Sequence, residues 1–265
     1  MEDLKMPLTE HLGELRKRII FSLTALLVTF SLCFAYSEEL FKFIMFPLRY
    51  ELDFSVRKMY LYFAPKDKLQ ATKLVFLAPA EAFWMSIKVS LVAGLTLALP
   101  VIFYNFWKFV APGLMPKEKR YAVPFIFATT ILFLVGSLFC FFIVLPFALT
   151  FLLGYKTGDV LMPMLSVGQY VDFCLKFVLA FGAVFELPVL IFFLTRLGIV
   201  TTDTLARNRK YSILFAFILA AFLTPTPDAF NQTLMAIPMI LLYEVGIWFS
   251  RLFAKRPDPE EKADE

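Results

Sequence analysis

Residues 121–155 read YAVPFIFATTILFLVGSLFCFFIVLPFALTFLLGY, a run without a charged side chain. At about 1.5 Å per residue, a helix over this run is longer than the roughly 30 Å hydrocarbon core of a bilayer. Residues 19–37 and 89–107 form two further charge-free runs. Because 60% of the 265 residues are hydrophobic and only 18% are charged, the chain has more apolar side chains than one soluble core needs. The sequence therefore predicts an all-α, multi-spanning membrane protein and argues against a soluble enzyme.

Six apolar runs are candidates for membrane spans. They cover residues 19–36, 81–107, 121–145, 170–195, 211–223 and 233–250. We expect one six-span membrane domain over residues 1–250 and a polar tail over residues 251–265.

The distribution of basic residues predicts the orientation of the spans. The N-terminal segment, the second and fourth loops and the tail carry 16 Lys and Arg, against 8 on the opposite side, 7 of them in one long loop. By the positive-inside rule, both termini are expected on the cytoplasmic side of a cytoplasmic (inner) membrane. The same clustering accounts for the net charge of +4 without a nucleic-acid partner.

The last two predicted spans are short. Residues 211–223 reach only about 20 Å, and the final span is interrupted by Pro238. Pro100, Pro146 and Pro188 lie within or at the edges of other spans, where the missing N–H groups are expected to kink the helices. We expect a curved, tilted bundle.

The loop of residues 37–80 is too long and too apolar for a bare connector. It contains Pro47 and amphipathic stretches such as residues 39–46. We expect short helices that lie over the outer face of the bundle as a cap.

Catalytic and cofactor motifs are absent from the sequence. It has no G-x-S-x-G, no H-E-x-x-H and no G-x-x-x-x-G-K phosphate loop. Cys33, Cys140 and Cys174 fall in or beside apolar runs without C-x-x-C spacing, so they are expected to be small hydrophobic residues. We expect a protein that is not an enzyme, binds no metal or cofactor, and draws any transport work from a gradient or a partner.

Two acidic residues stand out among the basic residues that flank the spans. An amphipathic helix is predicted to run into the first span; residues 16–18 suit a positive-inside anchor, but Glu14 does not. In the second loop, Glu118 follows Pro116 near a predicted helix N-terminus, where a carboxylate is favoured. Each acid has an ordinary surface explanation. Together, two cytoplasmic carboxylates at one membrane face would also form a receptor for a cationic peptide.

Lys88, Lys176, Glu186 and Glu244 lie inside the predicted spans, where a central charge costs about 2.5–3.5 kcal/mol. Lys88 and Lys176 lie close enough to span ends to snorkel, and Glu244 can reach the inner interface. Glu186 lies in mid-span between Phe185 and Leu187 and cannot easily snorkel. It is the strongest candidate for a functional role, either as a contact for a partner helix or as a proton site.

A series of short motifs follows along nearly the whole chain. They are His11-Leu-x-Glu14-Leu-Arg16-x-Arg18, Trp107-x-Phe109-x-Ala-Pro112-Gly-Leu, Glu118-x-Arg120, Tyr170-x-x-Phe173, Phe181-Gly-x-x-Phe185-Glu186-x-Pro188, Thr224-Pro, Pro227-Asp228-x-x-x-Gln232, Ala236-Ile-Pro238 and Glu244-x-Gly246. In this order they resemble the TatC family, the multi-spanning receptor subunits of the twin-arginine protein translocase.

The resemblance implies a receptor for signal peptides with consecutive arginines and a core subunit of a translocase that exports folded proteins, driven by the proton gradient. It implies that Glu14 and Glu118 bind the arginine pair, which agrees with the bidentate pairing of guanidinium with carboxylate. The neighbouring site residues that it implies are His11, Arg16, Arg18 and Phe109.

The same resemblance implies partners in the membrane: single-span subunits of the TatA and TatB type, further copies of the chain, and lipid. The polar residues that it matches to partner contacts are Glu186, Thr224 and Gln232, and those expected to be structural are Pro47, Asp228 and Glu244. The short last spans would thin the bilayer locally. The alternatives are a proton-coupled secondary transporter that uses Glu186 and a passive membrane scaffold. A transporter should show paired broken helices in two halves, and the sequence shows none.

Overall fold

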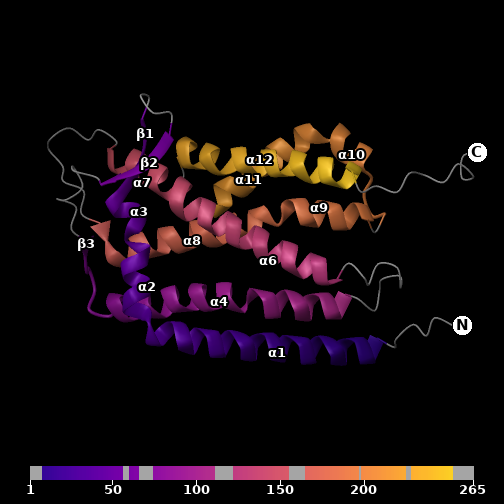
Figure 1. Ribbon diagram of the computed structural model, residues 1–265, viewed down its shortest axis with the longest axis horizontal. Coiled ribbons are helices and arrows are strands. Elements are labelled where there is room, and N and C mark those ends of the chain that lie inside the picture. Colours follow the sequence, from indigo (N-terminus) through magenta and orange to yellow (C-terminus); the bar gives the residue numbers. More distant parts are fainter. Residues whose placement is uncertain are drawn as a thin grey trace, which may run out of the picture. The chain divides into compact units, whose positions relative to one another are not determined.

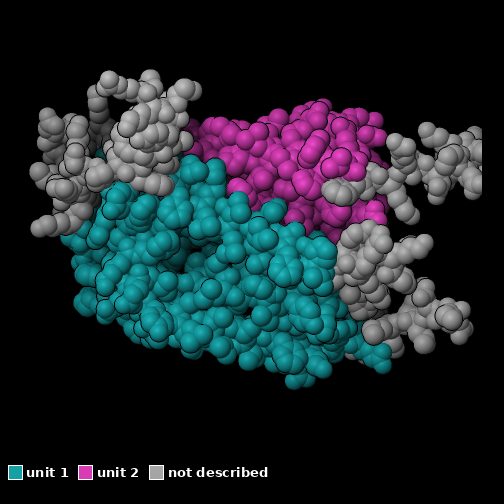
Figure 2. All heavy atoms as spheres, in the orientation of Figure 1, with its two compact units in different colours: residues 1–182 teal, residues 183–265 magenta. Residues whose placement is uncertain are grey.

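The computed structural model describes residues 8–55, 60–65, 74–110, 122–154, 165–196, 198–224 and 228–252. These residues fall into two compact units, residues 1–182 and 183–265, which Figure 2 shows in teal and magenta.

Within the described residues, helices long and apolar enough to cross a membrane cover most of the predicted spans. They are Glu10–Ala35, Glu81–Val110, Val123–Leu153, Val167–Arg196 and Ala229–Leu252. The remaining predicted span forms α11 (Arg209–Leu223), a helix of 15 residues. It is shorter than the roughly 18 residues that a membrane-spanning helix needs. The expected helical membrane fold is confirmed, and five of its six predicted spans are supported by length and composition.

In the first unit, α1 (Leu8–Ala35) lies along α4 (Glu81–Val110) (Figure 1). The segment before the first span is helical and continuous with it, as predicted. The two helices approach most closely at Gly94, where an added Cβ would lie 2.8 Å from the Cα of Phe30. A side chain at this position would therefore force the helices apart.

The third apolar run contains a change of helix type. It begins as α6 (Ala122–Phe139), continues as a π-helical segment (Cys140–Val144) and ends as α7 (Leu145–Gly154). Pro146 follows the π-helical segment directly and has no N–H to donate to the carbonyl four residues earlier. A π-helical turn is wider than an α-helical turn and can accommodate the hydrogen bond that the proline does not make.

The fourth apolar run is broken at Glu186. The first helix, α8 (Val167–Phe185), ends just before it, and α9 (Leu187–Arg196) begins just after it. Pro188 cannot donate to the carbonyl of Val184, and its ring crowds that carbonyl, so an uninterrupted helix is disfavoured. The helix is thus interrupted two residues before the proline at which a kink was predicted.

The loop after α1 combines helices with a β-hairpin. It begins with α2 (Ser37–Ile44) and α3 (Phe46–Arg49), as expected for a helical cap. The expectation of helices is wrong for the next segment, where β1 (Tyr50–Ser55) pairs antiparallel with β2 (Tyr60–Pro65). The sequence of β1, Tyr-Glu-Leu-Asp-Phe-Ser, alternates apolar and polar residues with the period of a strand.

Two contacts join residues between α1 and α4 to the start of α8. The buried Tyr170 hydroxyl donates to the carbonyl of Ile44 at 2.6 Å. Leu74–Val75 (β3) pairs in parallel with Leu165–Ser166 (β4). Segments that are distant in sequence are thereby joined beside the start of α8.

In the second unit, α12 (Ala229–Leu252) packs against α9 and α11. Gly246 permits the close contact with α9, because an added Cβ would lie 3.1 Å from the Cα of Pro188. A short helix, α10 (Thr202–Arg207), precedes α11 and is capped by the Thr201 hydroxyl, which accepts the N–H of Thr204 at 3.2 Å.

Candidate functional site

The N-terminal part of α1 is held against the C-terminal end of α4. The rings of His11 and Phe109 are stacked, with centroids 4.4 Å apart and an interplanar angle of 15°. An aromatic pair of this kind contributes about 0.5–1.5 kcal/mol beyond its buried area. The structure thus brings together two residues that the resemblance assigned to one site.

Glu14 lies one helical turn after His11 and is engaged by Arg18. The guanidinium Nη2 of Arg18 donates to Oε1 of Glu14 at 2.9 Å, and the two side chains are 21% and 22% exposed. Pairs with this spacing contribute only about 0.3–0.5 kcal/mol on a helix surface. The Glu14 carboxylate therefore already holds a guanidinium, by a contact weak enough to exchange.

Of the other two residues predicted for this site, the structure describes Arg16 but not Glu118. Arg16 lies on α1 and is exposed. Glu118 lies outside the described residues, between the end of α4 at Val110 and the start of α6 at Ala122.

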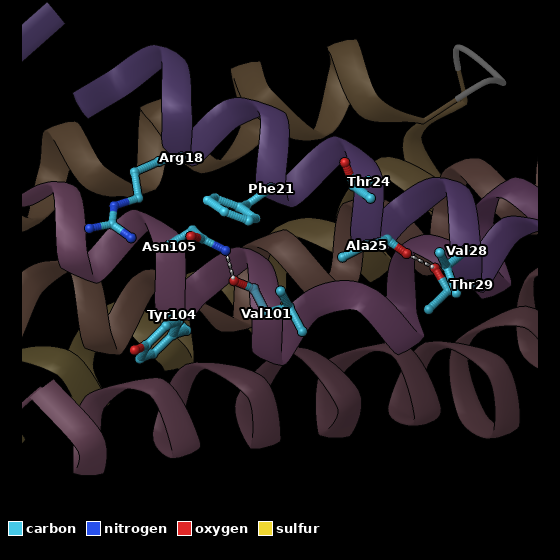
Figure 3. Close-up of a pocket in the computed structure, with 9 residues that line it drawn as sticks. All are labelled: Arg18, Phe21, Thr24, Ala25, Val28, Thr29, Val101, Tyr104 and Asn105. Carbon is cyan, nitrogen blue, oxygen red and sulfur yellow. Dashed lines mark hydrogen bonds between the residues drawn. The ribbon is translucent and has the colours of Figure 1, made fainter. Parts of the chain in front are cut away.

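A groove between α1 and α4 is a feature that the sequence did not reveal. Its volume is about 600 Å³, and Figure 3 shows its lining. It is lined by Arg18, Phe21, Thr24, Ala25, Val28, Thr29, Val101, Tyr104 and Asn105. Asn105 is buried and its amide donates to the carbonyl of Val101 at 2.9 Å. The one available signal was this single amide in the charge-free run of residues 89–107.

Lys88 forms an ion pair that sequence analysis missed. Its Nζ lies 2.7 Å and 2.9 Å from the two carboxylate oxygens of Asp172 on α8. Both side chains are partly exposed, at 45% and 39%, and Lys176 is exposed as well. Asp172 could have been noticed as the only acid near the start of the fourth apolar run.

Glu81 links the first turn of α4 to the first turn of α8. Its carboxylate accepts the N–H of Leu77 at 2.7 Å, the N–H of Gly168 at 3.0 Å and the hydroxyl of Ser166. The sequence did not predict this network, because an acid is favoured at a helix start without any tertiary contact.

Glu186 occupies the break between α8 and α9. Its N–H donates to the carbonyl of Ala183 at 3.1 Å, and its carbonyl accepts the N–H of Leu190 at 2.9 Å. The side-chain Oε1 is buried and has no hydrogen-bond partner among the described residues. A buried carboxyl oxygen without a partner is costly, so this atom is a candidate acceptor for a group from another chain.

Thr224 and Gln232 lie where α11 meets α12. The buried Thr224 hydroxyl donates to the carbonyl of Ala220 at 2.8 Å, and the Gln232 amide donates to the carbonyl of Phe217 at 3.1 Å. Asp228 caps α12, because its carboxylate accepts the N–H of Asn231 at 2.7 Å.

Glu186 and Gln232 lie at different levels of the second unit. Glu186 immediately precedes α9, where Pro188 lies beside Gly246 of α12. The helical rise from Gln232 to Gly246 is about 21 Å. The partner contacts that the resemblance grouped together are therefore separated along α12.

Two further residues expected to be structural are in close contacts. Pro47 is buried in α3. Glu244 forms two contacts with Arg209 of α11, at 2.6 Å from Nε to Oε1 and 2.9 Å from Nη2 to Oε2. Arg209 belongs to the fourth loop, which the positive-inside rule predicts on the cytoplasmic side, so the pair is compatible with the inner interface expected for Glu244.

The described residues contain no group of three or more His, Cys, Asp or Glu side chains that could hold a metal ion. The three cysteines are free and buried.

Comparison with known proteins assigns the family. The family model described as Sec-independent protein translocase protein (TatC) matches residues 10–238. The TatC protein of Desulforapulum autotrophicum is 41% identical over 261 residues, which cover 98% of this chain and 90% of that protein. The TatC protein of Aquifex aeolicus is 40% identical over 259 residues, which cover 97% of this chain and all of that protein.

Two crystal structures of the twin arginine translocase receptor TatC, one of them in DDM, have a similar fold. Their TM-scores are 0.77 and 0.76 at 38% and 39% identity, covering 91% and 92% of this chain and 99% and 100% of theirs. Members of this family are components of a protein translocase and are not enzymes. Membership of the family does not favour the alternative of a secondary transporter. On the family model, the relatives and the shared fold, this multi-pass membrane protein belongs to the TatC family of Sec-independent protein translocase proteins.

Proposed function

We propose that this chain is the signal-peptide receptor and core subunit of a twin-arginine translocase that exports folded proteins, driven by the proton gradient. Family membership and the likeness to structures of a twin arginine translocase receptor support this role. Glu14 and Glu118 bind the arginine pair of the signal peptide, and His11, Arg16, Arg18 and Phe109 complete the site.

The observation that carries the proposal is the ion pair between Glu14 and Arg18. Arginine presents the same group to the carboxylate that a twin-arginine peptide would present. A peptide arginine can replace Arg18 on Glu14 at low cost, because the internal pair is partly exposed and weak. Two peptide arginines gain further by engaging Glu118 at the same time. Lysine lacks the planar fork and is a poorer substitute.

The membrane arrangement proposed for this role follows the positive-inside pattern. Residues 1–250 form one six-span domain with α11 as the short fifth span, residues 251–265 form a tail, and both termini face the cytoplasm across the inner membrane. Single-span subunits of the TatA and TatB type contact Glu186, Thr224 and Gln232. The Oε1 of Glu186, which has no hydrogen-bond partner among the described residues, supports its part in these contacts.

The test is the affinity of the purified full-length protein for a fluorescent twin-arginine peptide. Glu14→Gln keeps the shape of the side chain and removes its charge, so binding should weaken by about 1.5–3 kcal/mol. Glu10→Gln is the matched control, because Glu10 is an exposed acid on the same helix and its loss changes the net charge equally. Equal losses in the two variants, or equal binding of Lys-Lys and Arg-Arg peptides, would contradict the assignment of Glu14.

A further inference from the structure

The groove between α1 and α4 lies between two points where the helices touch. At one end, the Thr29 hydroxyl donates to the carbonyl of Gly94 at 2.8 Å. At the other end, His11 stacks on Phe109. Between these contacts the helices leave a groove of about 600 Å³. It extends from Arg18 to Val28 along α1, a helical rise of about 15 Å.

The walls of the groove are apolar and open to the surroundings. Phe21 is 52% exposed, Val28 57% and Val101 43%. Ala25, between Phe21 and Val28, leaves room at the floor of the groove because its side chain is small. On a helix that spans a membrane, such a surface faces hydrocarbon, so the groove suits an extended apolar chain.

One end of the groove carries a cation with spare hydrogen-bond donors. Figure 3 shows Arg18 and Tyr104 at this end and Val28 and Thr29 at the other. A guanidinium has five N–H donors, and among the described residues Glu14 accepts from Arg18. The Nε of Arg18 is buried and has no partner among those residues. The side chain therefore has donors available for an anion.

Among the residues that the structure describes, the charges around this end are mainly positive. Arg16 and Lys17 are exposed on α1, and the Nζ of Lys108 lies 4.8 Å from the centre of the Tyr104 ring. The acids on this part of α1 are Glu10 and Glu14. An occupant that is apolar along its length and anionic at this end is complementary to the groove. A twin-arginine peptide is instead assigned to the carboxylate of Glu14, because the groove itself ends at the cation of Arg18.

We propose that the groove between α1 and α4 binds one anionic phospholipid, with an acyl chain along Phe21, Ala25 and Val28 and its phosphate at Arg18. The phosphate accepts charge-assisted hydrogen bonds from the guanidinium, for which planar fork geometry is well suited. The acyl chain fills the space that the crossing at Gly94 leaves open.

The first test replaces Val28 with the photoreactive residue benzoylphenylalanine and places the full-length protein in vesicles of equal phosphatidylglycerol and phosphatidylcholine. Mass spectrometry then counts the lipid adducts formed on illumination. We expect phosphatidylglycerol adducts to exceed phosphatidylcholine adducts by about tenfold, because both lipids carry the phosphate but only phosphatidylcholine brings a choline cation towards Arg18 and its basic neighbours. Equal numbers of the two adducts would overturn the proposal.

Single substitutions that remove or keep one positive charge test which residue causes the preference for phosphatidylglycerol. Arg18→Gln should reduce the ratio to about one, whereas Arg18→Lys, which keeps the charge but loses the planar fork, should keep only part of it. Lys17→Gln is the matched control, because it removes the same charge from a neighbouring exposed residue that does not line the groove. Equal reductions in Arg18→Gln and Lys17→Gln would show a diffuse surface attraction and would overturn the assignment of Arg18.

A second pair of variants tests occupation of the groove itself. Ala25→Trp fills the floor and should abolish most adducts at residue 28, whereas Leu27→Trp, on an exposed position outside the groove, should leave them unchanged. Excess free glycerol 3-phosphate should not displace the lipid, because it has no acyl chain; displacement would indicate a phosphate site instead. The assay contains no signal peptide, so its outcome is separate from that of the proposed receptor function.

Discussion

The hydroxyl of Thr29 on α1 donates to the backbone carbonyl of Gly94 on α4 at 2.8 Å. The contact depends on the glycine, because a Cβ at position 94 would lie 2.8 Å from both N and Cα of Phe30. Helices in a bilayer associate through such close packing and hydrogen bonds, since lipid tails are as apolar as the helix surfaces. This crossing therefore fixes how α1 lies on α4.

Gly94→Ala should destabilise the protein by about 1–3 kcal/mol, because the new methyl group overlaps the backbone of α1 and the helices must move apart. Thermal unfolding of the purified protein in detergent measures the change. Gly13→Ala is the control, since no atom lies within 4 Å of a Cβ at that position. Equal destabilisation by the two substitutions would contradict the role of Gly94 in the crossing.

Asp172→Asn should destabilise the protein more than the surface exposure of the pair suggests. It leaves Lys88 without its partner within an apolar span but away from its centre, so the cost should lie below the roughly 2.5–3.5 kcal/mol of a central lysine. The double variant Lys88→Met with Asp172→Asn should recover a large part of the loss. A double-mutant cycle from unfolding measurements gives the coupling energy, and additive single effects would show that the two residues act independently.

Glu186→Gln should keep near-normal partner assembly and export, whereas Glu186→Ala should lose both. Glutamine retains the acceptor oxygen that is buried and without a partner among the described residues, and alanine removes it. Hydrogen bonds between membrane helices contribute about 0.6–2 kcal/mol. Co-purification of single-span subunits and an export assay measure the two effects. A Gln variant that inserts and recruits partners normally but does not export would favour a proton carrier instead.

Inserting four leucines between Ala216 and Phe217 should impair export in a protein that still inserts. The helix α11 has 15 residues, a length of about 22 Å, and four more residues add about 6 Å, which reduces its mismatch with the bilayer. A three-residue insertion is the control for rotation, because four residues slightly exceed one turn. Normal export with the four-residue insertion would exclude mismatch from the mechanism.

Five of the six predicted membrane-spanning helices could be read from apolar runs of sequence. The reason is physical: the bilayer sets a minimum apolar length, and it leaves the helix as the way for such a run to satisfy its backbone. Pro188 similarly predicted a break at its position, because the missing N–H is a property of one residue. The prediction of short helices is wrong for β1 and β2, although Tyr50, Leu52 and Phe54 alternate with polar residues.

The contact between Glu14 and Arg18 follows from the sequence, whereas the contacts between different helices depend on the tertiary structure. Glu14 and Arg18 are four residues apart, and the helical period alone places them on one face. Lys88 with Asp172, and Thr29 with Gly94, meet only because particular helices are neighbours at a particular rotation. Apolar composition cannot specify which helices become neighbours, because an apolar face packs as readily against lipid as against another helix. The small and polar residues that decide the packing make their contacts only in the assembled bundle.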